Sequence, residues 1–284
     1  MKTALLHRSP TFRQTAAARS DAVGTMPVVS KLSEPGWTQP PDEAVRTAAS
    51  ELIELVDSHL PQRFYAGEHP WRMFSAAIIL RMADTVEGMM ALMAAGLPID
   101  GLNLLRALYE QVVRYLWVSI NPDDHIEAWG SNARYHLRKL HNDAVKFGQS
   151  VMDEGELAAA EGAKELPGLA DLALAVDSHW GGKMLGFRAP ASGRQGILTM
   201  RGLYTMVYRT ASRSAHLQPD SLEPYATLTT SPIVVNRPSK DESSIWWPLA
   251  VALYAHALIA CHDQLNWPDP DRVREINDRM YAQP

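Results

Sequence analysis

The stretch PIDGLNLLRALYEQVVRYLWVSI, residues 98–120, predicts a long amphipathic helix. Pro98 suits the first helical turn, and Asn121-Pro122 closes the helix. Its large apolar side chains recur at helical spacing along one face, at Leu105, Leu108, Tyr109, Val112 and Leu116. Asn103, Arg106, Glu110, Arg114 and Trp117 share the other side. A helix of this length and pattern is typical of the middle of a helical bundle.

The same helical period continues through most of the chain on both sides of this stretch. Only residues 227–235 have a strand-like composition, which is too little to build a sheet. The sequence therefore predicts an all-α helical bundle with a long irregular N-terminal leader. The other expected helices are 42–60, 74–95, 122–148, 153–165, 167–179, 198–217, 246–265 and 269–282.

The domain organisation follows from the position of prolines and charges. Residues 1–42 contain five prolines and carry only basic charges before Asp21, which predicts an irregular basic leader. This leader is read as a disordered arm, with an organellar transit peptide as the alternative. Residues 43–284 are expected to form a single all-helical domain, with a glycine-rich loop at 181–196.

Composition excludes several classes of protein. A net charge of −5 argues against a chain that coats nucleic acid by charge alone. Cys261 is the single cysteine, so neither an intrachain disulfide nor a cysteine-rich metal cluster is possible. The longest apolar run, residues 245–261, is shorter than the roughly 20 residues of a membrane helix. We therefore expect a cytoplasmic protein without a membrane contact. No HExxH or Glu-x-x-His pair is present, so neither metal nor cofactor is expected.

A second stretch, LYTMVYRTASRSAHLQP at residues 203–219, carries the candidate chemistry. As a regular helix it places Arg209 and His216 two turns apart on one face, with Leu203 and Tyr204 on the opposite side. It closes a window, residues 178–219, that has no acidic residue and six basic ones. That basic segment is the expected contact for RNA. Besides Arg209 and His216, its candidate residues are Tyr208, Ser212 and Arg213.

Two further expectations concern charge pairing. Arg106 and Glu110 are four residues apart, which favours a pair on one helix face. Two interpretations stay open: a solvated pair, or a buried one that faces Arg81 or the Arg209–His216 stripe. The acidic segment 151–177 is expected to pack against the basic window that follows it.

These motifs resemble a known family. Their order is Arg81-Met82-Ala83-Asp84, a turn at Gly96, Leu105-Arg106-x3-Glu110, and finally Tyr208-x3-Ser212-x3-His216. Over roughly residues 50–265 the chain resembles the bacterial helical family catalogued as domain of unknown function 5677. The resemblance names no activity, and it implies a shared polar cluster of Arg106, Glu110, Ser212 and His216.

A second resemblance bears on mechanism. Arg209-x6-His216 is similar to the R-x4–6-H motif of the HEPN superfamily, helical bundles that include metal-independent ribonucleases. The resemblance implies a homodimer that brings two motifs together. A histidine can move protons at a ribose hydroxyl, and an arginine can hold the phosphate. Thr210 departs from the polar Asn, Asp or His that is common after the arginine in active members.

Two hypotheses of function follow. The first is a metal-independent ribonuclease in a toxin or defence role, with Arg209, Ser212 and His216 catalytic. The remaining residues of its site, Arg81, Arg106, Glu110, Tyr208 and Arg213, then bind substrate. The second is a non-enzymatic scaffold or small-ligand-binding bundle, in which His216 caps its helix and the cluster is structural. A nuclease needs Arg209 and His216 accessible, whereas a structural cluster is buried.

Overall fold

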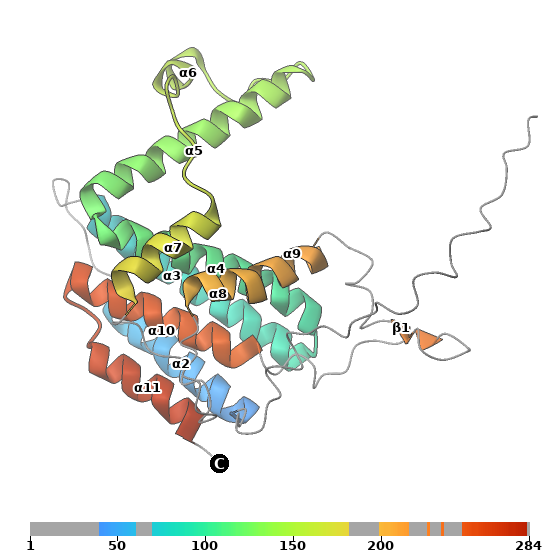
Figure 1. Ribbon diagram of the computed structural model, residues 1–284, viewed down its shortest axis with the longest axis vertical. Coiled ribbons are helices and arrows are strands. Elements are labelled where there is room, and N and C mark those ends of the chain that lie inside the picture. The colour runs from blue at the N-terminus through green and yellow to red at the C-terminus, as the bar shows by residue number, and fades with distance from the viewer. Residues whose placement is uncertain are drawn as a thin grey trace, which may run out of the picture. The chain divides into compact units, whose positions relative to one another are not determined.

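The computed structural model describes residues 40–60, 70–181, 199–215, 226–227, 234–235 and 246–282. Within these residues the chain is an all-α bundle, as predicted, with one small pair of strands (Figure 1). The predicted leader lies outside the described residues except for its last three. The division into a leader and a single domain therefore stays a prediction.

The helices begin and end close to the expected positions. Two helices match the prediction to the residue, Pro98–Ile120 and Trp246–Leu265. A third ends before Gly96, as predicted, and Gly96 has a φ of 68°. The helices are α2 (Asp42–His59), α3 (Pro70–Ala95), α4 (Pro98–Ile120), α5 (Pro122–Val145), α6 (Glu154–Ala159), α7 (Leu169–Trp180), α8 (Met200–Leu203), the π-helix η1 (Tyr204–Tyr208), α9 (Arg209–Ala215), α10 (Trp246–Leu265) and α11 (Pro270–Ala282). Strands β1 (Ala226–Thr227) and β2 (Val234–Val235) pair antiparallel at the two ends of the segment predicted to be strand-like, with Ala226 one residue before it.

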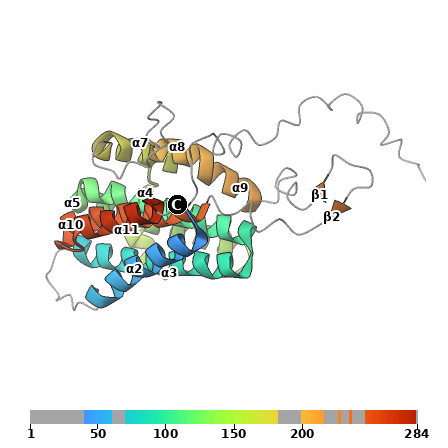
Figure 2. The same cartoon turned by 90° about the horizontal axis from the view of Figure 1, so that it is seen from below.

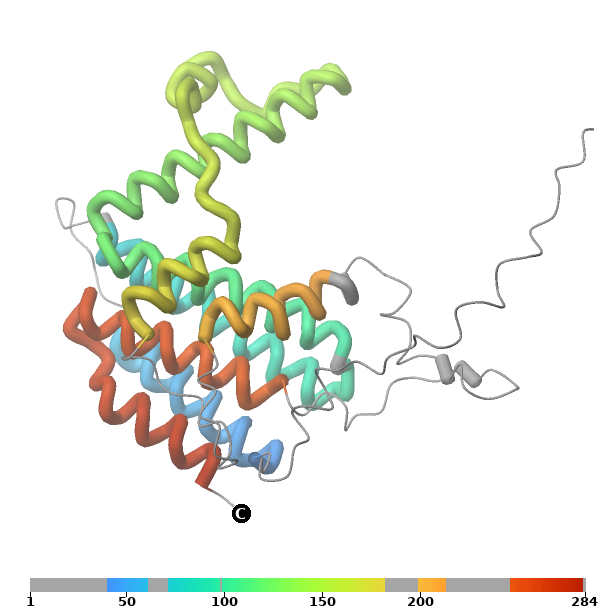
Figure 3. Tube along the Cα trace, viewed as in Figure 1, coloured from blue at the N-terminus to red at the C-terminus, as the bar shows by residue number. Residues whose placement is uncertain are grey.

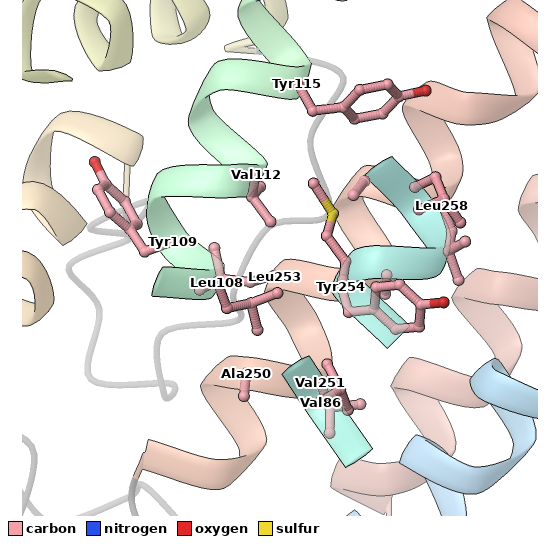
Figure 4. Packing of buried hydrophobic residues seen from close by; sticks show 14 of the residues in the cluster. Val86, Leu108, Tyr109, Val112, Tyr115, Ala250, Val251, Leu253, Tyr254 and Leu258 are labelled. Carbon is pink, nitrogen blue, oxygen red and sulfur yellow. The ribbon is translucent and has the colours of Figure 1, made fainter. Parts of the chain in front are cut away.

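The core lies where α3, α4 and α10 pack against one another. Helices α7, α8, η1 and α9 lie on one side of α4, and α2 and α3 lie on the other (Figure 2). Helix α11 packs on α2 and α10. Figure 4 shows how α4 contributes Leu108, Val112 and Tyr115 to the core, opposite Leu253 and Tyr254 of α10. The predicted apolar face of α4 is therefore the buried one.

Close packing between α4 and α10 explains a glycine in α4. A Cβ atom at Gly101 would collide with the indole ring of Trp247. Trp247 is 2% exposed, so the ring has no room to move away. Both Trp246 and Trp247 are buried at the start of α10, so they anchor this helix in the core.

Helix α5 leaves the bundle after its first two turns. Trp129 packs edge-on against Phe74 of α3, with ring centroids 4.6 Å apart, and it is the last α5 residue in contact with the core cluster. The rest of α5 projects from the bundle, and the chain returns through α6 to α7 (Figure 3). We call residues 130–151 the α5 projection.

Four side chains of α5 hold the returning segment through its backbone. Asn132 accepts a hydrogen bond from the Leu166 N–H at 2.9 Å. Arg138 donates to the Ala160 carbonyl, Ser131 accepts from the Lys164 N–H, and His141 Nδ1 accepts from the Met152 N–H. Because these contacts are polar, the projection is fixed without a large apolar core.

Among the described helices, none has the length and apolar character needed to cross a bilayer.

Candidate functional site

The candidate site is built on the continuous helix formed by α8, η1 and α9. Its first turn is capped twice: Thr199 Oγ1 accepts from the Gly202 N–H, and the Asp177 carboxylate accepts from the N–H groups of Met200 and Arg201 at 2.7 and 2.8 Å. A carboxylate at a helix N-terminus is favoured by the free N–H groups and the helix dipole. Asp177 is the last residue of the acidic segment 151–177. Within the described residues, this segment therefore contacts the start of the basic helix.

The middle of this helix is a π turn. The Arg209 N–H bonds to the Tyr204 carbonyl, five residues earlier rather than four. Such turns are rare, and they occur frequently at functional sites. The sequence prediction assumed a regular α-helix throughout, and it was wrong at this turn.

One face of the helix packs on α4. Leu203, Val207 and Ala211 are buried, as the pattern predicted. Beneath them Tyr109 of α4 donates a hydrogen bond from its hydroxyl to the Met200 carbonyl at 2.7 Å. Burial, with a smaller contribution from Asp177, raises the pKa of Tyr109 well above its usual value, so the phenol stays a donor. The helix is therefore anchored on α4 by both apolar and polar contacts.

On the neighbouring face two stacked tyrosine side chains lie between two arginines, one from this helix and one from α4. The Arg201 guanidinium lies 5.2 Å from the Tyr204 ring centroid, and the Tyr204 and Tyr208 rings stack 5.2 Å apart at 16°. Arg106 of α4 lies 4.7 Å from the Tyr208 ring centroid and donates to its hydroxyl at 3.1 Å. We call these four residues the arginine–tyrosine stack. Its cation–π contacts hold both guanidinium groups in place.

This arrangement corrects two expectations. Tyr204 was placed on the opposite side from Tyr208, but the rings stack because residues four apart are neighbours on a helix. Arg106 was expected to pair with Glu110, but Glu110 pairs with Arg114 at 2.8 Å, and Arg106 reaches Tyr208 instead. The Glu110 and Arg114 side chains are 32% and 25% exposed, so their pair is only partly buried. The buried Arg106–Glu110 pair that was the alternative does not form.

Three buried polar atoms beside the stack have no hydrogen-bond partner within the described part of the chain. They are Nε of Arg106, Oδ1 of Asn103 and Oγ of Ser212. Asn103 is one turn before Arg106 on α4, and Ser212 is one turn after Tyr208 on α9. A buried polar atom without a partner costs about 1–3 kcal/mol, so a ligand or water that satisfies these atoms would bind favourably.

The structure places the predicted site residues unevenly. Arg106 and Tyr208 come together between α4 and η1, Ser212 follows one turn later on α9 with its Oγ buried, and Arg209 is exposed directly after the π turn. Arg81 is exposed on α3, 3.8 Å from Asp84, and it does not join them. Arg213 belongs to α9, but its side chain is not among those described, and His216 lies outside the described residues.

Sequence reasoning missed the contributions of Tyr204, Arg201 and Asp177. The i, i+4 spacing of Tyr204 and Tyr208 was a usable signal for ring stacking. Asp177 gave no such signal, because its partners are backbone N–H groups that lie 23 and 24 residues away. Among the described residues, no three His, Cys, Asp or Glu side chains gather closely enough to hold a metal ion.

Comparison with known proteins places the chain in a family. Residues 73–231 match the family of unknown function DUF5677. The chain belongs to DUF5677. This match covers all of α4 and the helix α8–η1–α9, so the arginine–tyrosine stack lies inside the DUF5677 region. No curated protein and no solved structure matches the chain.

Proposed function

We propose that the chain binds RNA along η1 and α9 and cleaves it without a metal ion. The observation that carries this proposal is the exposure of Arg209 directly after the π turn, beside the arginine–tyrosine stack. Phosphate binding requires an accessible arginine, and Arg209 meets this requirement.

Local charge supports an anionic ligand. The two acidic groups nearest the helix are already engaged, Asp177 with backbone N–H groups and Glu110 with Arg114. Arg201 and Arg209 are both exposed on the same helix and have no acidic partner among the described residues. A phosphate backbone that follows the helix would meet both guanidinium groups.

The chemistry assigns separate roles to three side chains. Arg209 would hold the phosphate and stabilise the charge that develops on it. His216, known here from the sequence alone, would move the proton of a ribose hydroxyl. The stacked tyrosines do not offer a free ring face between them, so Arg201 at the open end of the stack would contact a base through its planar guanidinium.

Cleavage of total RNA in EDTA tests the proposal. We expect cleavage by the wild type, a loss of about a hundredfold or more for Arg209→Ala, and loss of activity for His216→Ala. Arg46→Ala is the matched control, because Arg46 is an exposed arginine on α2 that pairs with Glu43. Intact RNA with the wild type, or equal loss for Arg46→Ala and Arg209→Ala, would refute the proposal.

A second candidate function rests on a different observation. The unpartnered Arg106 Nε and Ser212 Oγ would donate to a small oxyanion, and Asn103 Oδ1 would accept from a hydroxyl of that ligand, as hydrogen phosphate carries. Binding to the folded state raises the melting temperature. Under this candidate, inorganic phosphate raises the melting temperature of the wild type but not of Arg106→Gln, and RNA stays intact.

A further inference from the structure

The α5 projection carries an unusual concentration of exposed apolar side chains. Leu137, Leu140, Val145, Phe147 and Val151 are 39%, 56%, 52%, 83% and 48% exposed. They account for five of the nine large apolar residues that are exposed in the described part of the chain. Contiguous exposed apolar surface of this kind marks interaction sites in soluble proteins.

Part of this surface follows a regular repeat. Gly130, Ala133, Leu137, Leu140, Ala144 and Phe147 are spaced alternately by three and four residues. Such spacing is the seam of a coiled coil. It places the first five on one stripe of α5, and Phe147 continues the pattern in the turn that ends the helix. We call it the α5 seam. The returning segment does not fill it, because that segment is bound through Ser131, Asn132, Arg138 and His141, which lie outside the seam.

We propose that the α5 seam pairs antiparallel with the α5 seam of a second copy of this chain. A two-fold axis between Leu137 and Leu140 sets these two leucines against their symmetry mates. The same axis sets Ala133 opposite Ala144 and Gly130 opposite Phe147. The pairing therefore places Phe147, the largest side chain of the seam, over Gly130, which has no side chain.

Gly130 has space for that contact. A Cβ atom there would meet only Arg134 Nη1, at 3.6 Å, so the backbone is open on this side. Phe147 is the most exposed large apolar residue described, and the turn that ends α5 holds it through an N–H bond to the Ala144 carbonyl at 2.9 Å. An aromatic side chain buries roughly 150–250 Å² when covered, and two such contacts form per dimer.

Charge at the edge of the seam fits the same arrangement. In an antiparallel coiled coil, the residues that immediately precede one of the two core positions of each heptad face one another across the helix pair. Asp143 and His136 occupy these positions, so each exposed carboxylate of one copy faces an exposed imidazole of the other. A parallel pairing instead sets glycine against glycine and phenylalanine against phenylalanine, and it lacks this match.

The length of the seam is compatible with the place where α5 leaves the bundle. From Gly130 to its end at Val145 the helix runs about 22 Å at 1.5 Å per residue, and Phe147 follows in the next turn. Gly130 follows Trp129, the last α5 residue that contacts the core cluster. The tip of one projection would thus end where the other emerges from its bundle. Pairing of this kind does not depend on whether the chain cleaves RNA.

Sedimentation velocity over a concentration series tests the pairing with complementary variants. We expect a wild-type dimer. Gly130→Leu fills the space that Phe147 needs, and Phe147→Ala removes the filling group, so each should raise the dimer dissociation constant about tenfold or more. Mixing the two single variants, or combining both substitutions in one chain, pairs the enlarged position with the truncated one and should restore dimerisation.

Met73→Ala is the control, because Met73 is 60% exposed and lies on α3, away from the seam. Circular dichroism checks that each variant is folded. A second pair tests the register through charge: His136→Glu should weaken the dimer, and adding Asp143→Lys should restore it. A monomeric wild type, a dimer that neither single variant weakens, or weakening without restoration in the mixture would each overturn the proposal.

Discussion

Helices α10 and α5 have similar lengths, 20 and 24 residues, but opposite surroundings. Fourteen residues of α10 are buried, including large side chains on every face. Two residues of α5 are buried, Asn132 and His141, and both are polar. Apolar packing around the central helix α10 therefore stabilises the bundle, whereas hydrogen bonds from side chains to backbone groups stabilise the projection. Substitutions in the two helices should differ in size and in kind.

The largest expected effect is a cavity in α10. Leu253 is fully buried against α4, so Leu253→Ala should lower the free energy of unfolding by about 2–5 kcal/mol, measured by urea denaturation. Val145→Ala in α5 is the matched control, because Val145 is 52% exposed and should change stability by about 0.5 kcal/mol or less. Equal losses for the two variants would abolish the contrast between the helices.

The pH dependence of stability should also originate in α10. Burial lowers the pKa of His256 from 6.5 to about 4, so the unfolded chain binds a proton that the folded chain does not between these values. Stability is fully present above pH 6.5 and falls as the pH drops toward 4, by about 3 kcal/mol from this residue. Denaturation measured at about pH 7, 5.5 and 4.5 should show a flatter profile for His256→Gln. An unchanged profile in this variant would assign the dependence to other groups.

A smaller, local effect is expected where α5 holds the returning segment. Asn132→Ala removes the acceptor of the Leu166 N–H, at a cost of about 1–2 kcal/mol. Hydrogen exchange of the Leu166 amide should become faster, with limited proteolysis between residues 150 and 166. Asn142→Ala is the control, because Asn142 is an exposed asparagine on the same helix. Unchanged exchange at Leu166 would show that this bond does not fix the segment.

The smallest effect concerns an exposed pair at the end of α5. The Lys146 ammonium, 2.6 Å from the Asp143 carboxylate, holds the pKa of that carboxyl below its usual range. Lys146→Ala should raise the pKa of Asp143, measured by NMR titration, without a detectable change in melting temperature. Lys139→Ala should raise it less, because the interaction of Lys139 with Asp143 is weaker. A larger shift from Lys139 would reverse this order.

The fold could be predicted from the sequence because its signals are local. Pro98 and Pro122 delimit α4, and the period of its apolar residues identifies the buried face. The continuous apolar composition of residues 246–265 identified the central helix for the same reason. The segment 153–165 was expected to be helical over a longer range than α6. Its start agrees with the capping box at Asp153, but the helix ends at Ala159, shortly before Gly162, which has a φ of 76°.

The candidate site could be predicted only in part because its contacts are distant in sequence. Arg106 and Tyr208 are 102 residues apart, so the local partner Glu110 looked equally suitable for Arg106. The sequence named Arg106 and Tyr208 separately as binding residues, and the structure brings these two together. The π turn carries no recognisable sequence signal, since Tyr204–Tyr208 reads as ordinary helix.

That π turn has a consequence for how this region tolerates changes in length. It accommodates one residue more than a regular helix would use, between the capped start at Met200 and the exposed Arg209. Deletion of Thr205 would let the backbone relax into an ordinary α-helix, so folding should survive. Because the π turn already absorbs this extra residue, the later side chains would keep about their present orientation relative to α8. A loss of three nucleotides at this codon would therefore leave Arg209 and Ser212 facing the same way, whereas the same loss in a regular helix would turn every later side chain by about 100°.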